Sequence, residues 1–314
     1  MFSQKFGIEI EFTGITRSKA AEVAKDYFNG SVQSTFDCYN TQNVTALDGR
    51  VWKLMSDASI KCQKKEGRQI VSARSEYSVE LVSPVLTYYE DIKTVQELVR
   101  RLRKAGGFVN RSCGIHIHLD GASHTPRSIR NFVNIIASKN DLLYKALQIA
   151  PERMQYCKKM DAYLVDRMNR QKPRTFPQIE SIWYEGYRHE SRNQHYHSSR
   201  YHFLNLHSFW RGNRTVELRG FNSDLHAGKI RAYIVLALAL NHQALTQKSA
   251  SSRKVQSENE KFAMRVHLNR IGFIGDEFKS CREHLYLHLS GNAAWRYGRD
   301  LRKDNNQEGE NQNG

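Results

Sequence analysis

The segment FGIEIEF, residues 6–12, alternates apolar residues with small or acidic ones along its whole length. Successive side chains of a β-strand point to opposite faces of a sheet, so its phenylalanines and isoleucines share one face. Glu9 and Glu11 then share the other face with Gly7. We therefore predict a strand over Gln4–Gly14 that buries one face and presents two carboxylates on the other.

Two later segments alternate in the same way, CGIHIHLD (residues 113–120) and TVELRGF (residues 215–221). In the first, His116 and His118 oppose isoleucines. In the second, Glu217 and Arg219 oppose a valine and a leucine. An antiparallel sheet with one solvated face produces such alternation. A solvated face usually mixes Lys, Ser, Thr and Gln, however, whereas these runs supply metal ligands and one arginine.

This inventory of side chains suits a divalent cation. Mg²⁺ and Mn²⁺ prefer oxygen donors, and Mn²⁺ also tolerates imidazole. Two further acids fit such a site, because Asp57 begins a D-x-S loop and Glu80 stands in the otherwise apolar segment YSVELVSP, residues 77–84. A buried acid is costly unless it is paired or metal-bound. A turn residue at Asp57 and an exposed acid at Glu80 are the alternatives.

Six segments in this order resemble the motifs of the amidoligase family: FGIEIEF, the D-x-S loop, VELVSP, CGIHIHLD, RYHFLNL (residues 200–206) and TVELRGF. That family belongs to the glutamine synthetase and glutamate–cysteine ligase superfamily. The resemblance runs from Phe6 to Phe221. It implies an α+β fold with a glutamine-synthetase-like, mostly antiparallel sheet that has a concave active-site face, and with helices packed on the other side.

The resemblance also implies an activity and roles for single residues. The activity is ATP-dependent joining of a carboxylate to an amine, through an acyl phosphate, with Mg²⁺ or Mn²⁺. His118 would lie near the nucleotide phosphates and Arg219 would stabilise the transferred phosphoryl group, so both count as catalytic and nucleotide-binding candidates. The implied metal ligands are Glu9, Glu11, Asp57, Glu80, His116 and Glu217. The implied nucleotide- or substrate-side residues are Arg200, Tyr201 and Asn205.

Two other classes of metal protein compete with the ligase. A metal-dependent phosphoesterase or nuclease would use the same acids and histidines. The H-x-H pair is also found in cupins, but these expect a glutamate soon afterwards, where this chain has Asp120 and His124. The sequence has no P-loop and no G-x-G-x-x-G, so ATP would be held by the sheet face and the metal ions.

The charge of the chain bears on its partners. Lys plus Arg number 48 against 32 Asp plus Glu, a formal net charge of +16, which favours anionic partners without choosing among them. With the basic, aromatic segment Arg188–Tyr201, it leaves open a nucleic-acid-binding module. We expect instead a small amine, an amino acid, a peptide or a protein as substrate, and no membrane. A homo-oligomer remains open, and the donor and the acceptor stay unassigned.

The location expected for the protein is the cytoplasm. The five cysteines form no C-x-x-C pair and are odd in number, which predicts free thiols in a reducing compartment. Met1–Phe12 does not have the pattern of a signal peptide. The apolar run Tyr233–Leu240 is too short to span a bilayer.

The remaining segments divide into predicted elements. We expect one catalytic domain over residues 1–300, with a loop or lid over 172–199, a C-terminal part of three helices over 224–290, and a disordered tail over 301–314. Helix N-caps are predicted at Ser18 and Thr125. The predicted helices are Ser18–Phe28, Tyr89–Ala105, Pro126–Gln148 and Glu152–Arg170. The further predicted strands are Arg50–Ser56, Ile70–Ser83 and Arg200–Phe209, with a hairpin as the alternative for Ile70–Ser83. Residues Ser31–Asp48 are predicted to be irregular.

Overall fold

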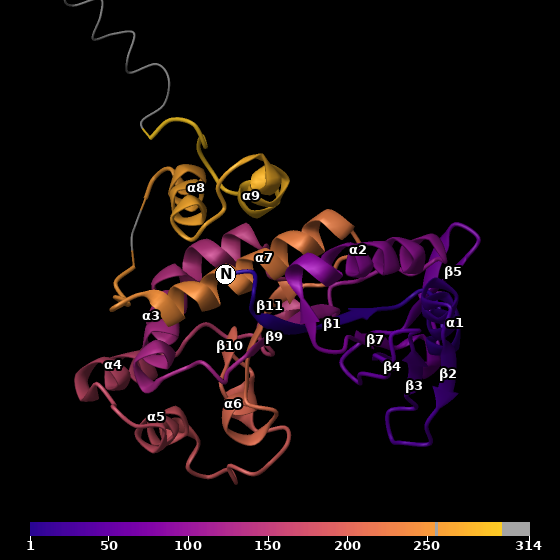
Figure 1. The fold of residues 1–314 in the computed structure, drawn as a ribbon, viewed down its shortest axis with the longest axis horizontal. Helices are drawn as coiled ribbons and strands as arrows, with labels where there is room; N and C mark the ends of the chain where they lie inside the picture. The colour runs from indigo at the N-terminus through magenta and orange to yellow at the C-terminus, as the bar shows by residue number, and fades with distance from the viewer. Residues whose placement is uncertain (255–256, 297–314) are drawn as a thin grey trace, which may run out of the picture.

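The computed structural model describes residues 1–254 and 257–296, which form an α+β fold of helices and an antiparallel sheet (Figure 1). Within these residues the main sheet has nine strands in the order β10-β11-β9-β1-β7-β4-β3-β2, with β8 also paired to β1. The bounds are β1 Lys5–Phe12, β2 Ser31–Ser34, β3 Gln42–Thr45, β4 Val51–Met55, β7 Val79–Val82, β8 Leu86–Thr87, β9 Gly114–Asp120, β10 Leu204–Asn205 and β11 Thr215–Asn222. A separate hairpin pairs β5 (Gln63–Glu66) with β6 (Gln69–Ser72).

Helices cover one face of this sheet. Figure 1 shows α2 and α7 lying along that face, with α3 beside α7 and with α8 and α9 farther out. The bounds are α1 Arg17–Phe28, α2 Tyr88–Lys104, α3 Pro126–Ala146, α4 Ala162–Gln171, α5 Phe176–Trp183, α6 His207–Arg211, α7 Ala227–Thr246, α8 Glu260–Arg270 and α9 Lys279–Tyr286. Short 3₁₀ turns include η1 Ser75–Tyr77, η2 Pro151–Arg153, η3 Glu185–Tyr187, η4 Ser198–Arg200 and η5 Asp276–Phe278.

The core lies between the sheet and these helices. The apolar residues of β1 that alternate with its glutamates are at most 2% exposed, and those of β9 are fully buried. Helix α7 packs against β9, α2, α3 and α9 and is apolar on almost every side, as expected of a helix enclosed by protein. The apolar face predicted for the first strand is therefore confirmed, and it fixes which face of the sheet remains for the polar residues.

Several predicted elements are confirmed. Helix α2 matches Tyr89–Ala105 within one residue. Helix α3 begins at Pro126, and the Thr125 hydroxyl accepts a hydrogen bond from the Ser128 amide, which makes Thr125 the predicted N-cap. The helical C-terminal part is present as α7, α8 and α9. All five cysteines are free.

Some expectations about local structure were wrong. The N-cap of α1 is Thr16, whose hydroxyl accepts from the Lys19 amide, and Ser18 lies inside the helix. Residues 31–48 contain the paired strands β2 and β3 at the sheet edge. The residues of β2 are exposed on both faces, so no alternation of burial marks the strand in the sequence.

The segments around the site also differ from expectation. Helix α4 begins only at Ala162, after the N-cap Asp161, rather than at Glu152. Residues 172–199 are not all loop, because Thr175 caps the helix α5 within them. The predicted strand Arg200–Phe209 is reduced to β10, because the Asn205 side chain accepts from the His207 amide and α6 begins there. Over the predicted strand Ile70–Ser83, β6 pairs with β5, and β7 starts at Val79.

Two expectations are not tested by the described part of the chain. The tail at 301–314 lies outside the described residues, and the single domain over residues 1–300 stays a prediction.

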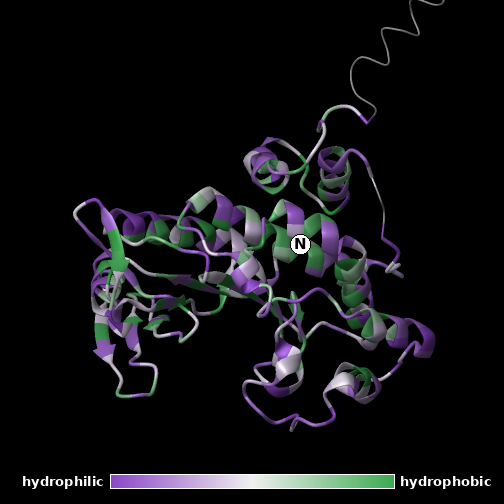
Figure 2. Ribbon diagram, turned by 180° about the vertical axis from the view of Figure 1, so that it is seen from behind, coloured by the Kyte–Doolittle hydropathy of each residue, from purple (hydrophilic) through white to green (hydrophobic). Residues whose placement is uncertain are grey.

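In Figure 2 each long helix carries both hydrophilic and hydrophobic residues. Among the helices of the described residues, none combines the length and the apolar character needed to cross a bilayer.

Candidate active site

The strand register brings the predicted polar residues to one face of the sheet. Glu9 of β1 lies opposite His116 of β9, and Glu11 lies opposite Glu80 of β7. In the same way His118 lies opposite Glu217 of β11. Residues that are directly opposed in antiparallel strands project from the same face. Four neighbouring strands, β7, β1, β9 and β11, therefore point acids and histidines in one direction, away from the helices that cover the core.

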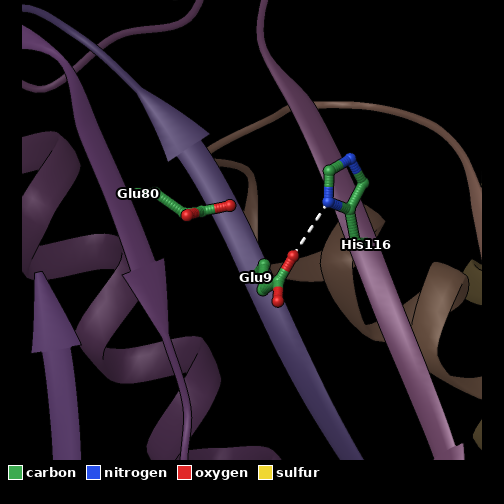
Figure 3. A group of neighbouring side chains, drawn as sticks. All are labelled: Glu9, Glu80 and His116. Carbon is green, nitrogen blue, oxygen red and sulfur yellow. Dashed lines mark hydrogen bonds and ion pairs between the residues drawn. The ribbon is translucent and has the colours of Figure 1, made fainter. Parts of the chain in front are cut away.

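Glu9 stands between the two histidines. Its Oε2 lies 2.9 Å from Nδ1 of His116, and its Oε1 lies 3.0 Å from Nε2 of His118. The second contact is an ion pair without hydrogen-bond alignment, so Nε2 of His118 is a buried nitrogen with no hydrogen-bond partner. Figure 3 shows Glu9, Glu80 and His116 turned toward one another from three different strands. Glu9 is thus shared between the two histidines.

Three overlapping groups bring possible metal ligands within 4.8 Å of one another. These groups are Glu9–Glu80–His116, Glu9–His118–Glu217 and Glu11–Asp57–Glu80. Three of their acids are buried, with Glu11 3%, Glu80 8% and Glu217 2% exposed, and Glu9 and Asp57 are half-buried. The alternative of an exposed acid at position 80 is therefore wrong. Carboxylate-rich donor sets with an imidazole fit Mg²⁺ or Mn²⁺.

Burial and mutual repulsion raise the pKa values of two acids in the cluster. Burial, followed by the negative charge of Asp57, raises the pKa of Glu11 to about 8. Burial, followed by Glu9 and Glu11, also raises the pKa of Glu80 well above its ordinary value. Carboxylates packed together in a low dielectric cannot all ionise unless positive charge joins them. A divalent cation would supply that charge and displace the protons.

The two histidines titrate in opposite directions. Burial disfavours the charged form of His118, but Glu9 and Glu217 outweigh it and raise its pKa to about 9. For His116, burial and the nearby Arg219 prevail and lower the pKa to about 4. At neutral pH His116 is therefore neutral, as a metal ligand must be, whereas His118 carries a positive charge.

Glu217 is held by two neighbours. Nη1 of Arg219 lies 2.5 Å from its Oε1, and Nδ2 of Asn205 donates to its Oε2 at 2.6 Å. Burial would raise the pKa of Glu217, but Arg219 and then His118 outweigh it and lower the pKa to about 2. Glu217 is therefore an anion with fixed orientation, and Arg219 is oriented with it.

A cavity of about 670 Å³ opens beside this face, a size usual for small-molecule sites. Glu11, His116 and Arg219 line it from the sheet, and Asp57 lines it from the loop after β4. The lining also includes Arg200, Tyr201, Tyr39 and Tyr196 from the segments around the cavity. The hydroxyls of Tyr39 and Tyr196 lie 2.8 Å apart, so they join the loop between β2 and β3 to the segment that precedes β10.

A model of the family described as "Putative amidoligase enzyme" matches residues 3–241. The chain belongs to this family. The amidoligase match runs from before β1 into α7 and includes every residue of the face described above. Membership makes this protein an enzyme of the ligase type. A search of curated proteins found no significant match.

The structure places the residues predicted from the sequence as follows. Glu9, Glu11, Glu80, His116, His118 and Glu217 come together on the amidoligase sheet, with Asp57 beside Glu11 and Glu80. Arg219 pairs with Glu217 and lines the cavity, and Arg200 and Tyr201 line it too. Asn205 is different: it is 1% exposed and holds Glu217, and it is not among the residues that line the cavity.

Sequence reasoning missed other residues that line this amidoligase cavity, among them Tyr39, Arg153, Tyr156 and Tyr196. They stand in turns and loops, where no alternation shows which way a side chain points. The one signal available was the abundance of tyrosine and arginine between residues 187 and 201. For that segment the sequence predicts a loop or lid and leaves open nucleic-acid binding, without pointing to a single residue.

Proposed function

We propose that this amidoligase is an ATP-dependent carboxylate–amine ligase, which forms an amide or peptide-type bond through an acyl phosphate and uses Mg²⁺ or Mn²⁺. The observation that carries the proposal is the set of three overlapping acid and histidine groups beside an arginine, on one sheet face. A carboxylate is a poor electrophile, and phosphorylation by ATP makes it reactive toward an amine. Such transfers depend on positioning and on stabilising charge.

Each residue of the face has a role in this proposal. The metal ligands are Glu9, Glu11, Asp57, Glu80, His116 and Glu217. Bound divalent ions would neutralise phosphate charge and help to orient the nucleotide. Arg219 would donate its planar fork to the phosphoryl group in transfer, since a guanidinium suits two-point contact with phosphate oxygens. His118, which is charged at neutral pH, would lie toward the nucleotide phosphates.

The sheet and the cavity support the finer parts of the proposal. An antiparallel sheet with helices on one face and acids on the other agrees with a glutamine-synthetase-like fold. The cavity would take a small amine, an amino acid or the end of a peptide. Arg200 and Tyr201, on its lining, would contact the nucleotide or the substrate. Nucleic acid remains the less favoured partner.

The test is a screen for ADP release from ATP and Mg²⁺ with a panel of amino acids, other carboxylates and amines. The expected result is ADP release that needs both a carboxylate and an amine and that yields an equal amount of amide product. The matched variants are Glu9→Gln, within the cluster, and Glu97→Gln, which pairs with Arg101 on the exposed side of α2. Only Glu9→Gln should abolish release. Metal-dependent hydrolysis of a phosphodiester, with no amine-dependent ADP release, would establish the phosphoesterase or nuclease instead.

A further inference from the structure

Strand β11 contains a bulge where it passes β9. Leu218 lies opposite Ile117 and Phe221 lies opposite Ile115, so the register shifts by one residue between them. A bulge disrupts the ladder locally and redirects the side chains at that point. Arg219 is one of the two residues inside the shift. The direction of its side chain is therefore set by whatever stabilises the bulge.

Arg153, from the turn η2, binds the backbone on both sides of this bulge. Its Nη2 donates to the carbonyl of Arg219 at 3.0 Å, and its Nη1 donates to the carbonyl of Phe221. The Arg153 side chain is 2% exposed, and within residues 1–254 and 257–296 it forms no ion pair with an acid. Buried carbonyls without partners are costly, and one rigid fork satisfies two of them.

The guanidinium of Arg153 packs against the backbone of Gly114. A Cβ placed on Gly114 would lie 2.2 Å from Nη2 of Arg153, so only glycine leaves room at that position of β9. The segment that follows η2 also contacts the side chain of Arg219, because the Tyr156 carbonyl accepts from Nε of Arg219 at 3.4 Å. The segment that carries Arg153 thus holds Arg219 by both backbone and side chain.

We infer that Arg153 is a positioning residue, which fixes the bulge of β11 and thereby directs Arg219 toward Glu217 and the cavity. The inference rests on the proposed function, because the direction of Arg219 affects a rate only if Arg219 contacts the transferred group. Lysine keeps the charge of Arg153 but ends in a compact ammonium that lacks the planar fork. The exchange of arginine for lysine therefore separates geometry from charge.

The test compares Arg153→Lys with Arg282→Lys. Arg282 also donates to two carbonyls, those of Phe273 and Gly275 at 2.7 and 2.9 Å, but it lies in α9 outside the cavity. For Arg153→Lys, kcat for ADP release should fall on the order of ten- to a hundredfold with little change in KM for ATP, as expected when a reacting group is displaced. Backbone amides of residues 218–222 should exchange hydrogen faster. Arg282→Lys should change neither kcat nor the hydrogen exchange of residues 218–222.

A second variant tests the same contact by changing Gly114 of β9. Gly114→Ala should displace the guanidinium and lower kcat in the same way, and Gly114→Ala with Arg153→Lys should be no worse than Arg153→Lys alone. If Arg153→Lys does not fold, Gly114→Ala provides the comparison. A variant with wild-type kcat and wild-type hydrogen exchange at 218–222 overturns the inference, and so does a loss confined to KM.

The inference and the proposed ligase activity can fail separately. If the wild-type protein releases no ADP with any carboxylate and amine, the ligase proposal is refuted. Hydrogen exchange then still decides whether Arg153 fixes the bulge, since that measurement needs no turnover. Faster exchange at 218–222 in Arg153→Lys, but not in Arg282→Lys, supports the inference. Unchanged exchange in Arg153→Lys overturns it.

Discussion

Nη1 of Arg219 lies 2.5 Å from Oε1 of Glu217, two residues earlier on the same strand. Both side chains are largely buried, at 6% and 2% exposure. The arginine is therefore oriented before any ligand arrives, which is what stabilisation of a transition state requires. The same contact would also serve as a structural ion pair, so the two roles must be separated by experiment.

Replacement of Arg219 by lysine separates them. We expect Arg219→Lys to fold and to bind ATP, with kcat lowered on the order of a hundredfold or more, because the group it contacts gains charge only in the transition state. Steady-state kinetics and nucleotide titration measure the two quantities. The matched control is Arg50→Lys, because Arg50 forms an ion pair at 2.7 Å with the buried Asp91, outside the cavity. The Arg50→Lys protein should have a lower free energy of unfolding and an unchanged kcat. Early melting of Arg219→Lys with an unchanged rate would make Arg219 structural.

Binding of ATP should depend on a divalent metal. The chain has no P-loop, so ions held by the acids are expected to provide the main link to the phosphates. Calorimetry with Mg²⁺ or Mn²⁺ should give an ATP affinity at least about tenfold higher than with a chelator, equal to roughly 1.4 kcal/mol. Glu80→Gln should reduce this difference, whereas Glu22→Gln on the exposed side of α1 should not. Equal affinity in chelator would remove the role given to the acids.

The metal-free protein should become less stable as the pH rises. The pKa of Glu11 is raised from 4.5 to about 8 in the fold, so between these values the folded state binds more protons than the unfolded state. Stability is then fully present below pH 4.5 and is lost as the pH rises through 8. From pH 6.5 to 8, Glu11 should contribute roughly 1–2 kcal/mol to this loss, at about 1.4 kcal/mol for each unit.

Urea unfolding of the wild type and of Glu11→Gln, both in chelator, measures this loss. Glutamine does not ionise, so the variant should show a flatter pH profile over the same range. Added Mg²⁺ should reduce the slope of the wild type, because the cation favours the ionised carboxylate. Parallel profiles for the two proteins would show that Glu11 does not titrate in this range.

The N-cap of α1 can be tested directly. The Thr16 hydroxyl accepts the Lys19 amide, whereas Ser18 was predicted to be the cap and lies within the helix. Thr16→Ala should lower the free energy of unfolding by about 1 kcal/mol, the usual cost of a lost cap, and Ser18→Ala should change it by less than about 0.5 kcal/mol. Chemical denaturation compares the two. A larger loss for Ser18→Ala would contradict the cap seen here.

The sequence predicted the parts of the site that lie on regular strands. Alternation in β1, β9 and β11 gives the face of each side chain, because the period of a strand is fixed at two. The order of the motifs then indicated that Glu9, His116 and Glu217 come together. The sequence could not show which strands are neighbours, since that depends on pairing between residues far apart along the chain.

Prediction failed where a contact from elsewhere determines the local structure. The strand expected over Arg200–Phe209 ends at Asn205, because that side chain holds both Glu217 and the start of α6. Arg153 lies in a 3₁₀ turn, where a lone arginine is indistinguishable from a surface residue. Its importance becomes visible only when β11 and Gly114 are placed around it.

The order of the strands has a consequence for how the protein is made. Strand β1 pairs with β7 and β9, and Glu9 lies close to Glu217, which follows it by more than 200 residues. Pairings so distant along the chain form slowly, and until they form both edges of β1 can pair with other molecules. Until these strands pair, the open edges of β1 favour aggregation. Co-expression with chaperones should raise the soluble yield more than a change in induction strength does.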